Sequence, residues 1–171
     1  MEISNYKKQI PNKKNTAGYT LIEILVVLTV IGLLFGLGYA NFRDFSRRQA
    51  VNDAVKLIQG DLRLAQSDAI TGQKPVPGCG TSNTLNSYTF RVISASEYKI
   101  EADCGVAPAP SVKDVYLPSG ITVLTPLPVP LAFKVLGQGT DVGSSDWTLT
   151  LKQDGTANKA TVTVTSGGEI K

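Results

Sequence analysis

The feature that most constrains this chain is a run of apolar residues close to its N-terminus. Residues 19–42 read YTLIEILVVLTVIGLLFGLGYANF and contain one charged side chain, Glu23. No charged residue occurs from residue 24 to residue 40. As a helix this segment would be about 36 Å long, enough to cross the hydrocarbon core of a bilayer. We therefore predict a transmembrane helix over residues 19–42.

Three simpler interpretations of the run compete with this one. A cleaved signal peptide is disfavoured because the run exceeds the usual apolar region and no A-x-A-like site closes it. A buried core helix is disfavoured because the uncharged stretch is so long. A plain signal anchor explains the hydrophobicity but not Glu23. An acid inside a membrane segment costs roughly 2.5–3.5 kcal/mol on insertion scales, so it usually has a partner and a role.

Basic residues lie on both sides of the run. Those before it are Lys7, Lys8, Lys13 and Lys14, and those after it are Arg43, Arg47 and Arg48. The positive-inside rule applied to the lysines predicts a cytoplasmic N-terminus and an exported C-terminal part. The three arginines oppose this orientation in part, although Asp44 lies among them and the lysine cluster reaches the translocon first, so the predicted orientation stays N-in, C-out.

The rest of the chain is electrically neutral. Residues 1–18 hold four of the 17 basic and one of the 14 acidic residues, which leaves 13 of each. A nucleic-acid-binding protein usually shows a basic footprint, so the overall charge gives no support for that function. A local cluster of Lys152, Lys159 and Lys171 could still form on folding.

Composition also argues against an enzyme. The chain has no histidine and two cysteines, which excludes Ser-His-Asp and Cys-His systems, His-ligated zinc and Cys-only zinc. It has no phosphate-binding loop or nucleophile elbow, and Asp141, Asp146 and Asp154 are spaced like solvated acids of turns. We expect no catalytic site, no metal and no cofactor.

Cys79 and Cys104 are the two cysteines. In an exported protein they most simply form one disulfide, which would close a loop of roughly 25 residues and stabilise the fold by about 3 kcal/mol. Two free buried thiols are the alternative.

The position of Glu23 suggests a partner for its charge. If the chain were cut between Gly18 and Tyr19, the new α-amino group would lie near the same membrane level as Glu23. Helices that pack with a small axial offset could then pair the amine of one subunit with Glu23 of a neighbour.

The string GYTLIE at residues 18–23, after a lysine-rich leader and before the apolar run, resembles the processing signal of type IV prepilins and type II secretion pseudopilins. The resemblance implies that prepilin peptidase cuts after Gly18 and methylates Tyr19, and that Glu23 acts in subunit docking. Phenylalanine is commoner at the position of Tyr19, and an 18-residue leader is long. Many major pilins have proline where this chain has Ala40, so no family-style kink is carried over.

Two glycines of the run are spaced for close helix contact. Gly32 and Gly36 form a small-xxx-small pair, which allows two helices to approach closely in lipid. Glycine is common in membrane helices in any case.

The helix is predicted to continue as an amphipathic segment over 43–72. An apolar stripe with spacings of three and four marks its buried face: Val51, Val55, Ile58, Leu62, Ala65 and Ala69. Gly72 and Pro75 should end it. The opposite, polar face is either solvated or an interface with neighbours.

A β-rich head is predicted over 73–171. The candidate strands are Tyr88–Ile93, Glu97–Glu101, Ile121–Leu124, Leu131–Val135, Trp147–Leu151 and Thr161–Thr165. Residues 108–111 and 125–130 should be loop or edge segments, and turns are expected at 154–155 and 167–168. The predicted class is α+β, a long N-terminal helix packed on an antiparallel sheet.

Two further stretches resemble GspH/FimT-type minor pseudopilins, DLRLAQSDAITGQKPV at 61–76 and TVTVTSGGEI at 161–170. The expected function is a minor pilin or pseudopilin of a type IV pilus or type II secretion-like filament; the alternative is a DNA-binding minor pilin of a competence pilus. Expected partners are other such subunits, prepilin peptidase, an inner-membrane assembly platform and, before assembly, membrane lipid.

Overall fold

The computed structural model describes residues 18–76 and 78–171, including all side chains except those of 37–41 and 44. The chain forms two compact units that divide between Phe42 and Arg43. The first unit contributes the beginning of helix α1 (Leu21–Thr71), and the second contains the remainder of α1 and every strand. The leader predicted over 1–18 lies outside the described residues, apart from Gly18.

Helix α1 ends where the sequence predicts, because its last turn closes on a glycine. Gly72 has φ +65° and donates its N–H to the Ala69 carbonyl at 3.2 Å. Gln73 donates its N–H to the Asp68 carbonyl at 3.1 Å. These two bonds form a Schellman motif, in which a glycine in the left-handed conformation satisfies carbonyls at the helix end.

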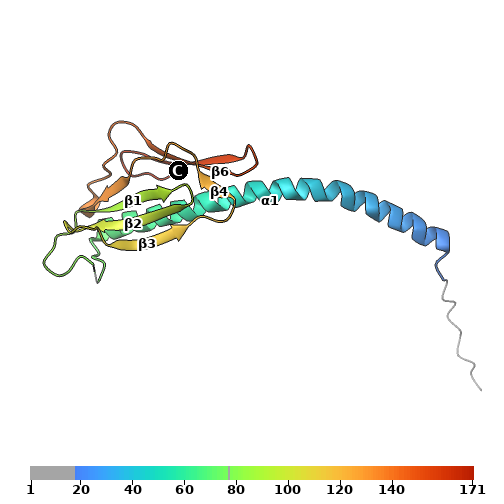
Figure 1. The fold of residues 1–171 in the computed structure, drawn as a ribbon, viewed down its shortest axis with the longest axis horizontal. Coiled ribbons are helices and arrows are strands. Elements are labelled where there is room, and N and C mark those ends of the chain that lie inside the picture. The colour runs from blue at the N-terminus through green and yellow to red at the C-terminus, as the bar shows by residue number, and fades with distance from the viewer. Residues whose placement is uncertain (1–17, 77) are drawn as a thin grey trace, which may run out of the picture. The chain divides into compact units, whose positions relative to one another are not determined.

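The second unit contains two antiparallel sheets, labelled in part in Figure 1. The larger sheet has the order β3-β2-β1-β5, with β1 (Ser87–Ser94), β2 (Glu97–Asp103), β3 (Ser111–Tyr116) and β5 (Leu131–Lys134). The smaller sheet has the order β4-β6-β7, with β4 (Ile121–Val123), β6 (Trp147–Gln153) and β7 (Lys159–Val164). The α+β class predicted from the sequence is confirmed.

Each predicted strand region contains an observed strand, but the prediction missed β3. Its residues, SVKDVY, are largely exposed and include a lysine and an aspartate, so no buried alternation was visible in the sequence. The strand forms because its backbone pairs with β2, from Glu97↔Tyr116 to Glu101↔Ser111. Its place at the sheet edge explains the polar composition, since edge strands often carry charges.

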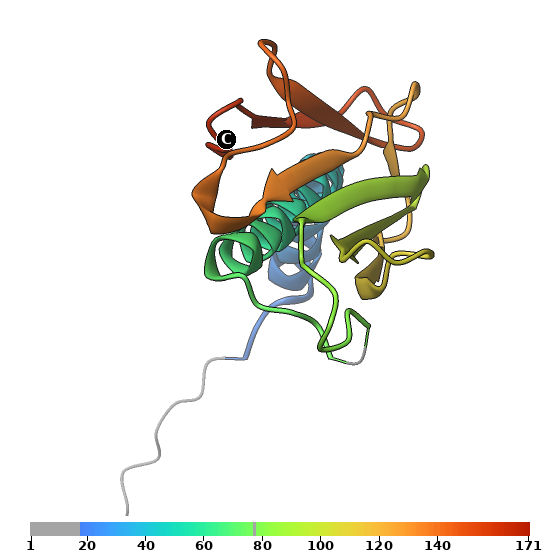
Figure 2. The same cartoon turned by 90° about the vertical axis from the view of Figure 1, so that its left-hand side faces the viewer.

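The core of the second unit lies between α1 and both sheets. Figure 2 looks along the C-terminal turns of α1 and shows the strands gathered around them. The residues of α1 that are buried in this core are Val51, Ala54, Ile58, Leu62, Ala65 and Ala69. Ala54 was missing from the predicted stripe, and Val55 is only half-buried. Burial of a valine, leucine or isoleucine stabilises by about 1.5–3 kcal/mol, so this face dominates the attachment of α1.

A carboxylate also lies on the buried side of α1. Asp61 is 5% exposed, and its carboxylate accepts hydrogen bonds from the Tyr98 hydroxyl at 2.7 Å and from the Lys113 ammonium at 2.5 Å. Tyr98 belongs to β2 and Lys113 to β3, so one side chain of α1 joins two strands. The charge is therefore both paired and hydrogen-bonded, as a buried carboxylate requires.

The two cysteines form a disulfide. Cys79 and Cys104 are both buried, and their Cα atoms are 5.4 Å apart. The bridge ties the segment after α1 to the end of β2.

We predict that Asp61→Ala lowers the free energy of unfolding by about 2–4 kcal/mol. The substitution leaves the buried Tyr98 hydroxyl without its acceptor and removes the partner of Lys113. Urea unfolding of the chain in a mild detergent measures the change. Asp53→Ala is the matched control on the same helix, because Asp53 is exposed and lies 3.8 Å from Lys56; it should change stability by less than about 0.5 kcal/mol. Equal losses in the two variants would contradict the structural role of Asp61.

The turn after β5 holds a leucine in a conformation that suits asparagine or glycine. In the 3₁₀ segment η1 (Val135–Gly137), Leu136 has φ 58° and Gly137 has φ 71°. The Gln138 N–H donates to the Val135 carbonyl at 3.4 Å, which closes a four-residue turn with positive φ at both central positions. Such turns favour Asn-Gly. Leu136 is 75% exposed, so burial of its side chain offsets little of the backbone strain.

Leu136→Asn should therefore raise the free energy of unfolding by about 1 kcal/mol, because asparagine tolerates the left-handed conformation better than leucine does. Thermal or urea unfolding in detergent measures the gain. Leu127→Asn is the control: Leu127 is also partly exposed, at 38%, but has no positive φ. A gain for Leu127→Asn as large as that for Leu136→Asn would show that hydrophobicity, and not backbone strain, is responsible.

Candidate assembly segment

The N-terminal segment begins with a capped helix. Residues 18–20 precede α1, and the Thr20 hydroxyl accepts a hydrogen bond from the Glu23 backbone N–H at 3.3 Å. The Thr20 carbonyl accepts from the Ile24 N–H at 3.2 Å. Glu23 thus occupies the third helical position after a threonine cap, the spacing of a capping box. An acid in the first turn also interacts favourably with the helix dipole.

Large apolar side chains of this segment are exposed. Between residues 19 and 35 their exposed fractions range from 41% to 85%. The residues concerned are Tyr19, Leu21, Ile22, Ile24, Leu25, Val26, Val27, Leu28, Val30, Ile31, Leu33, Leu34 and Phe35. A contiguous apolar surface of this kind marks a site that meets a partner or a membrane.

The two glycines predicted to pack against another helix have no such role inside the chain. A Cβ added at Gly32 or Gly36 would meet no atom within 4 Å, and neither glycine has a positive φ. Neither the backbone conformation nor a described neighbour requires a glycine there. The contact of Gly32 and Gly36 with a second helix stays a prediction.

Polar groups in the segment are satisfied locally. Thr29 donates its hydroxyl to the Leu25 carbonyl at 2.6 Å, one helical turn earlier.

In the part of the chain that the structure describes, no helix is long and apolar enough to cross a membrane.

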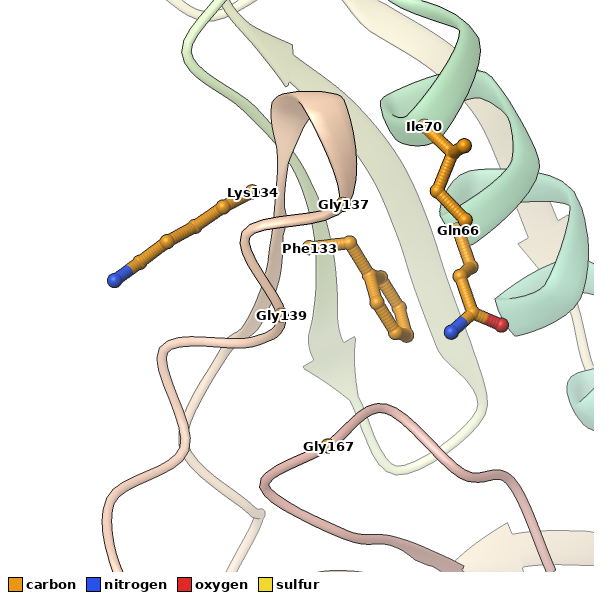
Figure 3. A pocket seen from close by; sticks show the side chains of 7 residues that line it. All are labelled: Gln66, Ile70, Phe133, Lys134, Gly137, Gly139 and Gly167. Carbon is orange, nitrogen blue, oxygen red and sulfur yellow. The ribbon is translucent and has the colours of Figure 1, made fainter.

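A small hollow lies beside the C-terminal end of α1, as Figure 3 shows. Its volume is about 80 Å³, and Gln66, Phe133, Gly139 and Gly167 help to line it. The Gln66 amide donates to the Gly168 carbonyl at 2.9 Å, and Lys134 points away from the hollow. A space this small, with its amide already bonded, offers no catalytic group. Among the described residues no group of three or more potential metal ligands occurs.

Two buried tyrosines of the larger sheet have perturbed acidity. Burial, the hydrogen bond to Asp61 and the charge of Asp61 raise the pKa of Tyr98. Burial, together with the nearby charge of Asp68, raises the pKa of Tyr88, whose hydroxyl donates to the Gln73 carbonyl. Both residues fasten strands to α1 or to the segment just after it, so their protonation supports the fold.

We predict that stability falls at alkaline pH. A tyrosine in the unfolded chain ionises near pH 10, whereas folded Tyr98 stays protonated there and the pKa of folded Tyr88 is also raised. The folded state then binds more protons, so Tyr98 lowers the free energy of unfolding by about 1.4 kcal/mol per pH unit above pH 10, and Tyr88 acts in the same direction. Urea unfolding at a series of pH values measures this slope. Tyr98→Phe should reduce the slope of the unfolding free energy against pH by about 1.4 kcal/mol per pH unit, the contribution of one proton. An unchanged slope would show that Tyr98 is not responsible for the loss of stability.

Sequence reasoning named Gly18, Tyr19 and Glu23 as candidates and did not anticipate two contacts that the structure shows. Thr20 caps the helix that carries Glu23, and the T-x-x-E spacing of a capping box was a readable signal for it. The buried role of Asp61 had no local signal, because its partners are 37 and 52 residues away in the sequence.

Comparison with known proteins supports the interpretation of the N-terminal segment. Residues 13–39 match a family described as the prokaryotic N-terminal methylation motif. A fimbrial protein of Pseudomonas aeruginosa is 27% identical over 77 residues, which are 45% of this chain and 50% of that protein. The type IV major pilin protein PilE1 of Neisseria gonorrhoeae is 32% identical over 54 residues, 32% of this chain and 30% of that one.

The chain spans about half the length, or less, of the curated relatives that it matches. No solved structure matches it. The matched relatives are fimbrial and pilin proteins, a structural and not an enzymatic class. The chain is therefore similar to fimbrial and type IV pilin proteins over part of its length, and its residues 13–39 carry a prokaryotic N-terminal methylation motif.

Proposed function

We propose that this chain is a minor pilin or pseudopilin subunit of a type IV pilus or a type II secretion-like filament. Prepilin peptidase would cut after Gly18 and methylate Tyr19, and the N-terminal helix would then carry assembly. The observation that carries the proposal is an exposed apolar segment with a single acid, Glu23, placed directly after the Gly18-Tyr19 junction.

The exposed apolar side chains of this segment must be shielded from water both before and after assembly. Before assembly, membrane lipid would surround residues 19–42, with the N-terminus cytoplasmic and the C-terminal part exported. The sequence of residues 37–41 completes the apolar run, although their side chains lie outside the described residues. In the filament, helices of neighbouring subunits would replace the lipid, and Gly32 and Gly36 would allow close approach.

Glu23 would supply the specific contact in this exchange. Processing creates an α-amino group at Tyr19, four residues before Glu23. Inside lipid an unpaired carboxylate is costly, so pairing with the amine of a neighbour would favour one axial offset between subunits. The inner-membrane assembly platform would act on subunits held in this way.

The assignment to a minor pseudopilin rests on two weaker resemblances, at residues 61–76 and 161–170. The alternative, DNA capture in a competence pilus, is less supported by the head. Three of its cations pair with acids there: Arg91 with Glu101, Lys99 with Asp114, and Lys171 with Glu169. Lys171, which the sequence suggested for a basic cluster, is thus neutralised.

Two substitutions separate the docking role of Glu23 from its place in the helix cap. Glu23→Gln removes the charge but keeps a residue that serves at this position of a capping box. Thr20→Val keeps the charge and removes the capping hydroxyl. We expect Glu23→Gln to reduce incorporation into filaments by at least roughly ten-fold, because the buried amine loses its partner. Thr20→Val should have a smaller effect.

Incorporation is measured by immunoblotting of sheared filaments against total subunit. The intact mass of the mature subunit, in each variant, reports cleavage after Gly18 and methylation, so a processing defect is recognised separately. If Glu23→Gln assembles normally while Thr20→Val does not, Glu23 acts through the cap and the docking proposal is wrong. A mature chain that begins elsewhere than Tyr19 would refute the processing site.

A further inference from the structure

The second unit contains a groove in which both charged lining residues are basic. It has a volume of about 340 Å³ and lies between the early part of this unit's helix and the turn that joins β6 to β7. The residues lining it are Arg48, Val51 and Asn52 of α1 and Ala157, Asn158 and Lys159 of the hairpin. The volume lies within the range of small-ligand sites. No carboxylate lines it.

The cations of the groove are available to a ligand. Among the described side chains, neither Arg48 nor Lys159 makes an ion pair or a hydrogen bond, and both are exposed. The hairpin contains one acid, Asp154, which accepts a hydrogen bond from the Thr122 hydroxyl at 3.0 Å. Asp154 does not line the groove.

One of the two groove cations belongs to a like-charge pair across the strands. Lys159 lies directly opposite Lys152 in the register of β6 and β7. Directly opposed like charges destabilise a pair of strands. Lys152 also has no ion pair among the described side chains. An anion bound between Lys159 and Arg48 would offset part of this repulsion.

We propose that this groove binds the phosphate of an anionic phospholipid headgroup while the subunit resides in the membrane. The inference rests on the proposed function, in which residues 19–42 cross the bilayer. Arg48 is the sixth residue after Phe42, and even a fully extended chain of that length spans at most about 22 Å. Arg48 therefore lies within about 22 Å of the end of the proposed membrane segment.

Lipid suits the groove better than nucleic acid does. A single-stranded nucleic acid needs a long basic track and aromatic side chains for base stacking, and no aromatic residue lines this groove. Arginines on the exported side also oppose the charge rule that orients the helix. After insertion, Arg48 could interact favourably with the phosphate of an anionic lipid.

The test titrates phosphatidylglycerol against the full chain in a non-ionic detergent, with native mass spectrometry of the first bound lipid. The double variant Arg48→Gln, Lys159→Gln should weaken this binding by about 25-fold, about five-fold for each cation near the lipid surface. Phosphatidylcholine should bind equally weakly to the unsubstituted chain and to the double variant. Leader lysines are present in every variant and cancel in the comparison.

The matched control is Arg63→Gln, Lys134→Gln. Arg63 lies on the same helix and Lys134 on β5; both are exposed and outside the groove, and the net charge changes equally. Equal losses in the two double variants would show non-specific attraction and overturn the proposal. So would the absence of any preference for phosphatidylglycerol over phosphatidylcholine.

Two competitors identify the source of the phosphate. Inorganic phosphate and a single-stranded oligonucleotide should displace phosphatidylglycerol poorly, because they lack acyl chains that enter the detergent. Displacement by either one at a lower concentration than the lipid itself would overturn the lipid assignment. Insertion into phosphatidylcholine nanodiscs is scored separately. A chain that fails to insert contradicts the proposed membrane stage as well, whereas one that inserts without lipid preference contradicts only the groove.

Discussion

The fold of the second unit depends on burial of one face of α1. Ile58, Leu62 and Ala65 are fully buried against strands of both sheets, and no other helix of comparable length contributes to this core in the described chain. The two sheets also meet directly, since the rings of Phe90 in β1 and Trp147 in β6 pack edge to face at 5.7 Å. A sheet of three or four short strands needs such cover for stability, so the helix is the shared element on which both sheets rest.

Polar contacts fix how α1 is placed against the strands. Asp61 hydrogen-bonds to β2 and β3 of the larger sheet, and Gln66 hydrogen-bonds to the turn after β7 of the smaller sheet. Hydrophobic burial is non-directional, whereas hydrogen bonds fix which residue meets which. The disulfide and the Tyr88 hydroxyl then hold the chain just beyond the helix. Register and rotation of α1 against the strands therefore follow from a few polar groups.

The sequence predicted those parts of the fold that depend on local signals. The stripe around Ile58, the glycine at position 72 and the alternation in most strands are patterns within a few residues. Strand β3 was missed because it forms through backbone pairing with β2 and buries little. The burial of Asp61 was missed because its partners come from distant strands. At the candidate segment the GYTLIE string predicted the candidate residues, but the cap by Thr20 became evident only when the start of α1 was located.

Two carboxylates of the same helix differ in how their charges are satisfied. Asp61 is buried, and partners within its own chain satisfy its charge. Glu23 is exposed, and among the described side chains its carboxylate has no ion pair, since Thr20 engages only its backbone N–H. In water an exposed carboxylate needs no partner, but in lipid it does. A carboxylate therefore has its partners at position 61, whereas the one at position 23 would lack a partner once the helix enters an apolar environment. Under the proposed function, the α-amino group of a neighbouring subunit would supply that partner.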